Sequence, residues 1–245
     1  MASESKRTAV VTGGSRGIGR AVAERLAAEG YDIAVAFHSN EAAAQEVADA
    51  VRQAGGSAIS VRCDVASSDD VSNLFDTAEE AFGRLDVTVN CAGDMMVGPL
   101  VEFDPETFDR LVAVNIRGAF LVSQQAARRT RPGGAIINIS TAAERQAIPG
   151  YGPYAMTKGA VEALTLILAR ELNGRDITVN TVAPGPTETD LFLRGKDEDL
   201  VRKIAGLNPF GRLGKPDEIA EVIAFLASGT RWVSGQTIFV NGGMN

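Results

Sequence analysis

The sequence predicts an α/β fold, a single doubly wound Rossmann-type domain with a seven-stranded parallel sheet and helices on both faces. Apolar runs of strand length alternate with helical patterns along the whole chain, as expected of repeated βαβ units. A glycine-rich turn follows the first of these runs and opens a helix. The 245 residues, 45% apolar and 22% charged, suffice for one sizeable core, and no composition shift or repeat divides residues 1–245.

The strands are expected where short apolar runs are bounded by turn residues. They are 8–12, 32–37, 57–62, 86–90, 134–140, 176–182 and 236–240. Apolar residues at helical spacing between these runs predict helices at 17–29, 41–54, 69–82, 105–130, 151–172 and 216–227. Residues 185–211 show no clear period. Because a loop that long inside a compact domain is usually functional, we expect a substrate lid there, with plain surface irregularity as the alternative.

The glycine-rich turn predicts a dinucleotide site. The strand Thr8–Thr12 runs into the turn Gly13, Gly14, Ser15, Arg16, Gly17, Ile18 and Gly19, and a helical pattern follows. Glycines let the backbone approach a pyrophosphate, and the unpaired N–H groups at a helix start favour negative charge. The strict G-x-G-x-x-G pattern is absent, because Val22 stands three residues after Gly19. The alternative is a turn that only joins the strand to the helix. The strand before it, the helix after it and the distant Tyr154/Lys158 pair make this alternative less favoured.

A tyrosine and a lysine four residues apart are the candidate acid–base pair. On a helix, Tyr154 and Lys158 share one face. A free phenol has a pKa of about 10, and a neighbouring cation can supply much of the downward shift needed near neutral pH. Tyr151 is the nearest rival, but Ala155 stands four residues after it, so it lacks the cation. The spacing alone is weak, since such pairs usually mark a solvated face.

Together, these motifs resemble those of the short-chain dehydrogenase/reductase family in its compact subtype. The resemblance runs from Thr8 to about Gly243. Further matching motifs occur in the family's order: Cys63-Asp64-Val65, Asn90-Cys91-Ala92-Gly93, Val114-Asn115-Ile116-Arg117-Gly118, Ile136-Ile137-Asn138-Ile139-Ser140-Thr141, Pro184-Gly185, Ser234-Gly235-Gln236 and Val240-Asn241-Gly242-Gly243. So many short motifs in one order are difficult to obtain by chance.

The resemblance implies four catalytic positions. Tyr154 would exchange the proton, and Lys158 would bond the nicotinamide ribose and link Tyr154 to a water chain ending at Asn115. The fourth position is a hydroxyl that bonds the substrate oxygen. Counting 13 residues back from Tyr154 favours Thr141, whereas a one-residue loop insertion favours Ser140. Adjacent strand residues point to opposite sides, so only one of the two can face the cofactor.

The resemblance also implies a set of cofactor contacts from six segments. Asp64 would bond the adenine amine, Thr187 a backbone group, and Thr189 the nicotinamide carboxamide. Cys91 replaces an asparagine, but the expected contact is a backbone carbonyl, so binding should survive. The full set is Gly13, Ser15, Arg16, Gly17, Ile18, Gly19, His38, Ser39, Asn40, Asp64, Val65, Asn90, Cys91, Ala92, Gly93, Tyr154, Lys158, Pro184, Gly185, Thr187 and Thr189.

The residues after the second strand favour NADP(H) over NAD(H). NAD-binding folds usually place a carboxylate there to bond the ribose 2′-hydroxyl, and it would repel a 2′-phosphate. Here His38, Ser39 and Asn40 follow the strand, with no acid before Glu41, while Arg16 can fork onto a phosphate. An exposed histidine with no role is the alternative for His38.

The composition limits the kinds of molecule that the protein is expected to bind. A net charge of −7 and a pI near 4.9 argue against nucleic acid and anionic membranes. Two cysteines 28 apart, without metal-ligand spacing, support neither a metal site nor a disulfide framework, and with a polar N-terminus they favour the cytoplasm. The family resemblance and the apolar helix stretch 160–168 predict a homotetramer or homodimer.

The predicted function is an NADP(H)-dependent oxidoreductase that transfers a hydride between the nicotinamide and a ketone, aldehyde or related carbonyl. An NAD-dependent alcohol dehydrogenase of the same fold is the first alternative, and a non-catalytic dinucleotide sensor is the second. The small-molecule substrate should be lined by Asp94–Met96, Ala142–Ile148 and the lid. Within the second segment, Glu144, Arg145 and Gln146 either contact a polar substrate or form a solvated loop.

Overall fold

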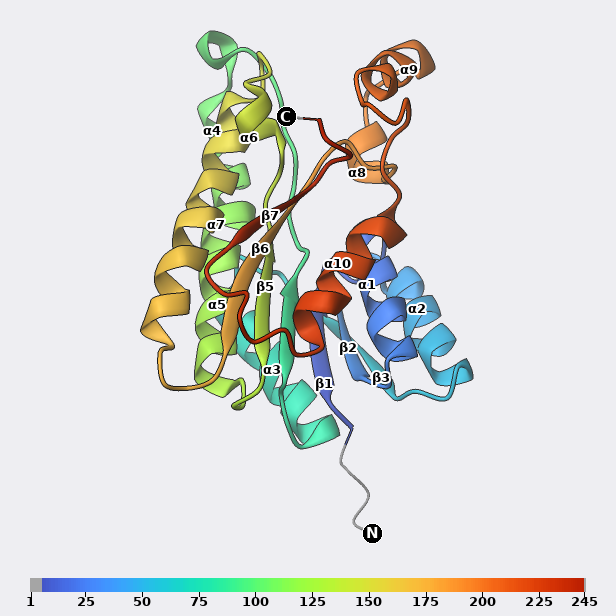
Figure 1. Cartoon of the computed structure of the whole chain (residues 1–245), viewed down its shortest axis with the longest axis vertical. Helices are drawn as coiled ribbons and strands as arrows, with labels where there is room; N and C mark the ends of the chain where they lie inside the picture. Colours follow the sequence, from blue (N-terminus) through green and yellow to red (C-terminus); the bar gives the residue numbers. More distant parts are fainter. Residues whose placement is uncertain (1–5, 245) are drawn as a thin grey trace.

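The computed structural model describes residues 6–244 and contains one sheet of seven parallel strands (Figure 1). The strands are β1 (Thr8–Thr12), β2 (Asp32–Phe37), β3 (Ala58–Arg62), β4 (Val87–Asn90), β5 (Ala135–Ile139), β6 (Thr178–Pro184) and β7 (Thr237–Val240). Their order is β3-β2-β1-β4-β5-β6-β7. The chain therefore builds outward from β1 to one edge, returns to the centre at β4, and builds to the other edge. The predicted fold class is confirmed.

Helices cover both faces of the sheet. One layer holds α1 (Gly17–Ala28), α2 (Glu41–Gln53) and α10 (Pro216–Ala227); the other holds α3 (Ser68–Phe82), α4 (Pro105–Val112), α5 (Gly118–Arg129) and α7 (Gly152–Glu171) (Figure 1). A hydrophobic core lies on each face of the sheet, and alternate residues of β1 point into the two cores. Ala9 and Val11 pack with the first layer, and Val10 packs with the second. A parallel strand buried on both faces needs such continuous apolar character.

All seven predicted strands and all six predicted helices lie near their expected bounds, with one interruption. The prediction of one continuous helix over 105–130 is wrong, because the π-helical turn Ala113–Arg117 separates α4 from α5. The turn holds the buried Asn115, whose amide groups bond to another loop rather than to the helix surface. A tertiary contact therefore sets the local geometry, which periodicity cannot reveal.

The prediction of an irregular stretch over 185–211 is also wrong. Two short helices lie there, α8 (Asp190–Leu193) and α9 (Glu198–Gly206). Each begins at a capping side chain: Thr189 accepts a hydrogen bond from the Phe192 N–H, and Asp197 accepts one from the Leu200 N–H. Two further short helices were not predicted, the 3₁₀ turn Leu100–Glu102 and α6 (Ala143–Gln146). Over residues 6–244, every helix is too short or too polar to cross a bilayer.

Candidate active site

The glycine turn forms a cradle between β1 and α1. Gly13 and Gly17 have φ angles of 63° and 53°, a region that favours glycine. A Cβ on Gly19 would lie 2.2 Å from the carbonyl oxygen of Gly13, so no side chain fits there. Arg16 precedes the first turn of α1 without capping it, and its side chain is exposed. The cradle therefore offers close backbone approach, a helix start and a cation, which fit a dinucleotide pyrophosphate.

Thr12 fastens this cradle to the segment after β4. Its hydroxyl donates to Asn90 Oδ1 at 2.7 Å and accepts from the Ala92 N–H at 3.1 Å. The predicted contacts Asn90 and Ala92 thus lie beside the glycine turn, since a Cβ on Gly13 would come within 3.0 Å of the Ala92 nitrogen. Thr12 was absent from the predicted site residues, although its position directly before the glycines was a usable signal.

A second part of the predicted cofactor site lies at the ends of β2 and β3. A cavity of about 590 Å³ is lined there by His38, Arg62, Asp64, Ser67, Asp69, Asp70 and Asn73. His38 is 70% exposed, and its Nε2 lies 4.0 Å from Asp64 Oδ2. Arg62 was not predicted. It pairs with Phe37 in the sheet register, which places a guanidinium next to the carboxylate-free end of β2.

The neighbours of that cavity use their polar groups locally. Asn40 caps α2 by accepting a hydrogen bond from the Ala43 N–H at 3.0 Å. Asp64 accepts from the Ala66 N–H, and the Asp64 N–H donates to Asp70. Val65 is buried against α5, where a Cβ on Gly118 would meet it at 2.7 Å. These contacts hold the predicted residues in place at the rim.

Four predicted catalytic residues converge at the carboxyl ends of β4 and β5; we call Asn115, Thr141, Tyr154 and Lys158 the catalytic corner. All four are buried. Lys158 Nζ donates to the Ile139 carbonyl at 2.9 Å and lies 5.9 Å from the centre of the Tyr154 ring. A Cβ on Gly93 would come 3.2 Å from Lys158 Nζ and 3.3 Å from Asn115 Oδ1. The missing side chain of Gly93 lets these two polar groups approach one space.

Asn115 is held by three hydrogen bonds. Its Oδ1 accepts from the Asp94 N–H at 2.8 Å, and its Nδ2 donates to the Asp94 carbonyl at 2.8 Å and to Thr157 Oγ1 at 3.0 Å. Thr157 in turn donates to the Tyr154 carbonyl at 2.8 Å. A buried asparagine needs such partners. Here they connect the π-helical turn, the loop after β4 and the helix that carries Tyr154.

Ser140 and Thr141 face different partners, as the pleat requires. Ser140 is buried, and its Oγ donates to Glu162 Oε1 on α7 at 2.6 Å. Thr141 accepts from the Ala143 N–H at 3.2 Å and directs its hydroxyl toward the Tyr154 phenol. Of the two candidates, Thr141 is therefore the one that lies with Tyr154. Glu162 was not predicted, and only the structure reveals it as the partner of Ser140.

Burial is the largest cause of the pKa shifts in and beside the catalytic corner. It raises the pKa of Tyr154 to about 12, against the lowering effect of a hydrogen bond from Thr141, and Tyr151 and Asp94 raise it further. Burial also lowers the pKa of Lys158 to about 8 and raises the pKa of the Cys91 thiol to about 12. The expected lowering of the phenol pKa by Lys158 is wrong for this structure, because burial raises the pKa of Tyr154 and Lys158 is not among the groups that shift it.

The segment after β6 resembles a clamp against the glycine cradle. The Gly185 N–H donates to the Val240 carbonyl at 3.0 Å, and a Cβ on Gly185 would meet Asn241 at 2.8 Å. Thr187 donates to the Gly185 carbonyl at 2.8 Å. The Thr189 methyl lies 3.2 Å from the position of a Cβ on Gly17. Pro184, Gly185, Thr187 and Thr189 thus bring the end of β6 to the start of α1.

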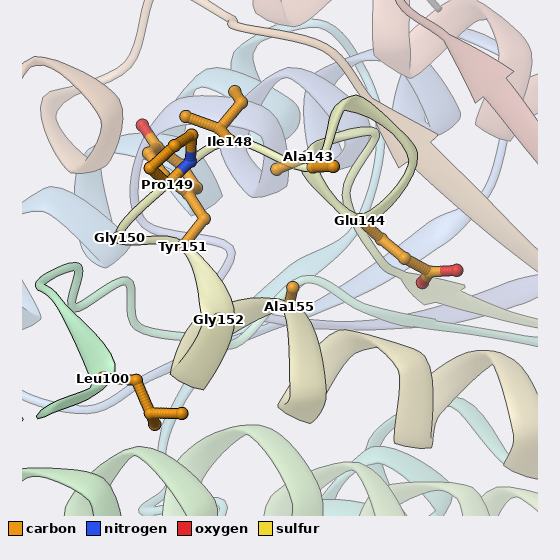
Figure 2. A pocket seen from close by; sticks show the side chains of 10 residues that line it. Leu100, Ala143, Glu144, Ile148, Pro149, Gly150, Tyr151, Gly152 and Ala155 are labelled. Carbon is orange, nitrogen blue, oxygen red and sulfur yellow. The ribbon is translucent and has the colours of Figure 1, made fainter.

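The loop after β5 borders a further cavity of about 380 Å³, lined in part by Leu100, Ile148, Pro149 and Tyr151 (Figure 2). None of the four residues of the catalytic corner lines it. Figure 2 shows the Glu144 carboxylate extending away from Ile148 and Pro149. The cavity is therefore a neighbour of the catalytic corner rather than its centre.

The three polar residues of this loop make intramolecular contacts. Partial burial raises the pKa of Glu144, and the neighbouring Glu162 carboxylate raises it further. The Arg145 guanidinium lies 4.3 Å from the centre of the Phe239 ring. Gln146 Nε2 donates to the Met244 carbonyl at 2.8 Å. The segment therefore contacts β7 and the end of the described chain, while Glu144 and Arg145 remain exposed to solvent.

A doubly wound sheet with a glycine cradle and a buried Tyr/Lys pair defines a dinucleotide-dependent oxidoreductase. A family model described as "Enoyl-(Acyl carrier protein) reductase" matches residues 13–245. The chain belongs to the short-chain dehydrogenase/reductase family.

Three similar proteins illustrate the relationship. A "Short-chain type dehydrogenase/reductase" from Picea abies is 46% identical, with 97% of this chain and 92% of the relative covered. An "NADPH-dependent aldehyde reductase-like protein, chloroplastic" from Arabidopsis thaliana is 42% identical, with 97% and 93% covered. The crystal structure of a short-chain dehydrogenase from Burkholderia cenocepacia in complex with NADP superposes with a TM-score of 0.91 at 37% identity, with 98% of each chain covered.

Proposed function

We propose that this protein is an NADPH-dependent carbonyl reductase. The observation that carries the proposal is the catalytic corner, where Thr141, Tyr154 and Lys158 meet beside the glycine cradle. The similarity to an NADPH-dependent aldehyde reductase-like protein and to a structure in complex with NADP supports the same chemistry. Bound NADPH would supply a hydride to the carbonyl carbon.

In this proposal, Tyr154 donates a proton to the carbonyl oxygen as negative charge develops there. Thr141, which faces the same phenol, holds that oxygen by a hydrogen bond. Lys158 bonds the cofactor ribose and, when protonated, offsets the negative charge left on the phenol. A phenol whose pKa is raised to about 12 is fully protonated near neutral pH, which suits an acid better than a base.

NADP(H) selectivity is proposed to come from cations around the end of β2. Arg16 is exposed at the start of α1, and Arg62 and His38 line the neighbouring cavity. The cavity also holds Asp64, Asp69 and Asp70, so Arg62 offsets part of a negative field that would repel a 2′-phosphate. We expect Arg16→Ala to weaken NADPH by tenfold or more while changing NADH affinity little.

The proposal is tested with purified protein, NADPH or NADH, and a panel of aromatic aldehydes, aliphatic aldehydes, ketones and quinones. Loss of absorbance at 340 nm reports turnover, and fluorescence titration reports cofactor affinity. We expect turnover of at least one carbonyl class and NADPH binding at least tenfold tighter than NADH. Equal cofactor affinities would overturn the selectivity assignment, and a preference for NADH would favour an NAD-dependent dehydrogenase. Cofactor binding without turnover across the panel would favour the sensor hypothesis.

The protein is further proposed to be a homodimer or homotetramer. Phe120 on α5 and Leu166 and Ile167 on α7 are exposed, although the apolar stretch 160–168 also contributes Val161 and Leu168 to the interior. An apolar face shared by two copies related by a two-fold axis would bury these side chains. A monomeric mass by light scattering at micromolar concentration would contradict this. Cysteines Cys63 and Cys91, both free, fit the cytoplasmic location that we propose.

A further inference from the structure

An ion pair joins two segments that lie 100 residues apart at the mouth of the site. Arg194, at the end of α8, places a guanidinium nitrogen 3.1 Å from Asp94 Oδ1 in the loop after β4. The two side chains are 48% and 34% exposed. Asp94 is among the predicted substrate-lining residues and Arg194 lies in the predicted lid, but no motif pairs the two residues, so their contact arises from the fold.

The Asp94 end of this bridge is rigid. The Asp94 N–H and carbonyl both bond to the buried Asn115, and the Asp94 carboxylate also accepts from the Met95 N–H at 2.9 Å. Asn115 is fixed in turn by Thr157. The Asp94 backbone is therefore attached to the catalytic corner through two hydrogen bonds to Asn115, and the Met95 N–H orients the carboxylate.

The Arg194 end is loosely packed. Residues 190–206, which we call the outer segment, comprise α8 and α9, and neither helix contains a buried residue. Its other polar contacts are local, such as Lys196 Nζ to the Phe192 carbonyl and the Arg202 pairs with Glu198 and Asp199. Within residues 6–244, Arg194–Asp94 is the one ion pair or side-chain hydrogen bond from the outer segment to a distant part of the chain.

The outer segment begins where the proposed cofactor clamp ends. Thr189 caps α8 and contacts the glycine cradle at Gly17. A displacement of α8 therefore moves Thr189, for which the family resemblance implies a contact with the nicotinamide carboxamide. The ion pair holds this helix to the loop that Asn115 fixes, so it links the clamp to the catalytic corner.

The same pair affects the electrostatics at Tyr154. The charged and titratable groups facing the phenol are Lys158 on its own helix, Tyr151 at the start of that helix, and Asp94 from the loop after β4. After burial, which is the largest cause, Tyr151 and Asp94 both raise the pKa of Tyr154, while Thr141 lowers it. Arg194 faces Asp94 and offsets its negative charge.

We infer that Arg194 is a positioning residue that acts through Asp94: it holds the outer segment closed over the cofactor clamp and offsets the carboxylate field at Tyr154. The inference rests on the proposed role of Tyr154 as proton donor. A half-exposed pair is weak, so it changes an open–closed equilibrium by about two- to fivefold. A contact of that strength can release with each turnover, which suits a segment that must admit substrate.

Four variants test this: Arg194→Gln, Asp94→Asn, the double variant, and the matched control Arg202→Gln, whose ion pairs stay within α9. Hydrogen–deuterium exchange of residues 190–206 is measured with and without NADPH. We expect about two- to fivefold faster exchange in Arg194→Gln and Asp94→Asn, no further increase in the double variant, and wild-type exchange in Arg202→Gln. Unchanged exchange in Arg194→Gln, or additive effects in the double variant, would overturn the inference.

The pH dependence of kcat/KM, measured in the alcohol-oxidation direction with the alcohol product of the best panel substrate, gives the second readout. Losing the guanidinium leaves Asp94 uncompensated, so the alkaline midpoint should rise by about 0.3–0.5 pH unit in Arg194→Gln and fall in Asp94→Asn. Shifts of the same sign would overturn the electrostatic part. Failure of the reductase proposal itself appears separately, as retained turnover in Tyr154→Phe, whereas the exchange measurement needs no turnover.

Discussion

The catalytic corner and the outer segment lie on opposite sides of the proposed reaction space and are built in opposite ways. Asn115, Thr141, Tyr154 and Lys158 are all buried, and each is fixed by hydrogen bonds or by close packing. The outer segment has no buried helical residue and one long-range ion pair among the described residues. We therefore expect the buried side to carry proton transfer and the loosely packed side to admit the substrate.

The strongest test of the rigid side is Tyr154→Phe. The change keeps the ring and its packing but removes the proton, so kcat should fall by about 100-fold or more while NADPH binding is retained. Tyr151→Phe is the matched control, because Tyr151 lies on the same helix turn and has no lysine four residues later. Steady-state kinetics and fluorescence titration provide the measurements. Equal losses in both variants would refute the assignment of the proton to Tyr154.

The glycine cradle gives the next largest effect. An added Cβ in Gly19→Ala would lie 2.2 Å from the Gly13 carbonyl, so the turn must shift. Overpacking of this kind costs about 2 kcal/mol. If the turn must recover its present shape to bind NADPH, that cost lowers the NADPH affinity by about 30-fold, and the strain also lowers the Tm. Gly206→Ala at the end of α9 is the control, because its Cβ would meet no atom within 4 Å. Tight NADPH binding by Gly19→Ala would show that the cradle does not hold the pyrophosphate.

Thr141→Ala and Ser140→Ala separate chemistry from packing. Thr141 faces Tyr154, so its loss should lower kcat by about tenfold or more with little change in Tm. Ser140 donates to Glu162, so its loss should cost about 1–3 kcal/mol of unfolding free energy, with kcat nearly unchanged. Kinetics and urea unfolding of both variants decide the matter. The reverse pattern would assign the substrate hydrogen bond to Ser140.

The smallest effect concerns the pH dependence of stability in the cofactor-free protein. Burial lowers the pKa of Lys158 from 10.5 to about 8, so between these values the unfolded chain binds the proton and the folded protein does not. The unfolding free energy should then rise with pH, by up to about 1.4 kcal/mol per unit, relative to Lys158→Met. The difference between the two proteins removes the opposing contributions of Cys63 and Cys91, whose pKa values are raised. Parallel curves would mean that Lys158 is charged in the folded state.

The sequence was sufficient for the sheet and for the residues whose roles depend on local motifs. Short apolar runs predicted every strand, because parallel strands buried on both faces leave a strong apolar signal. The Tyr154/Lys158 spacing and the glycine turn predicted residues that the structure brings close together. These signals are local, so they survive without knowledge of the tertiary fold.

The rest depends on contacts between distant segments. Thr141 could not be separated from Ser140 until the partner Glu162 was known. Arg62 and Arg194 belong to no recognisable motif. The pairing of β2 with β3 places Arg62 at the site, and the path of α8 places Arg194 there. The downward shift expected for the Tyr154 pKa was opposed by burial, which a spacing argument does not measure.

The π-helical turn Ala113–Arg117 has a consequence for how the gene can vary. One residue added to a helix rotates everything after it by about 100°. The π-helical turn holds one such extra residue, and only with that rotation do α4 and α5 both keep their present buried sides. The buried residues include Leu111 on α4 and Leu121, Val122 and Ala126 on α5. Deleting one residue here would restore a regular helix but turn the buried side of α5 toward water. Insertions and deletions should therefore be excluded from this stretch, whereas the surface of α9 can accommodate them.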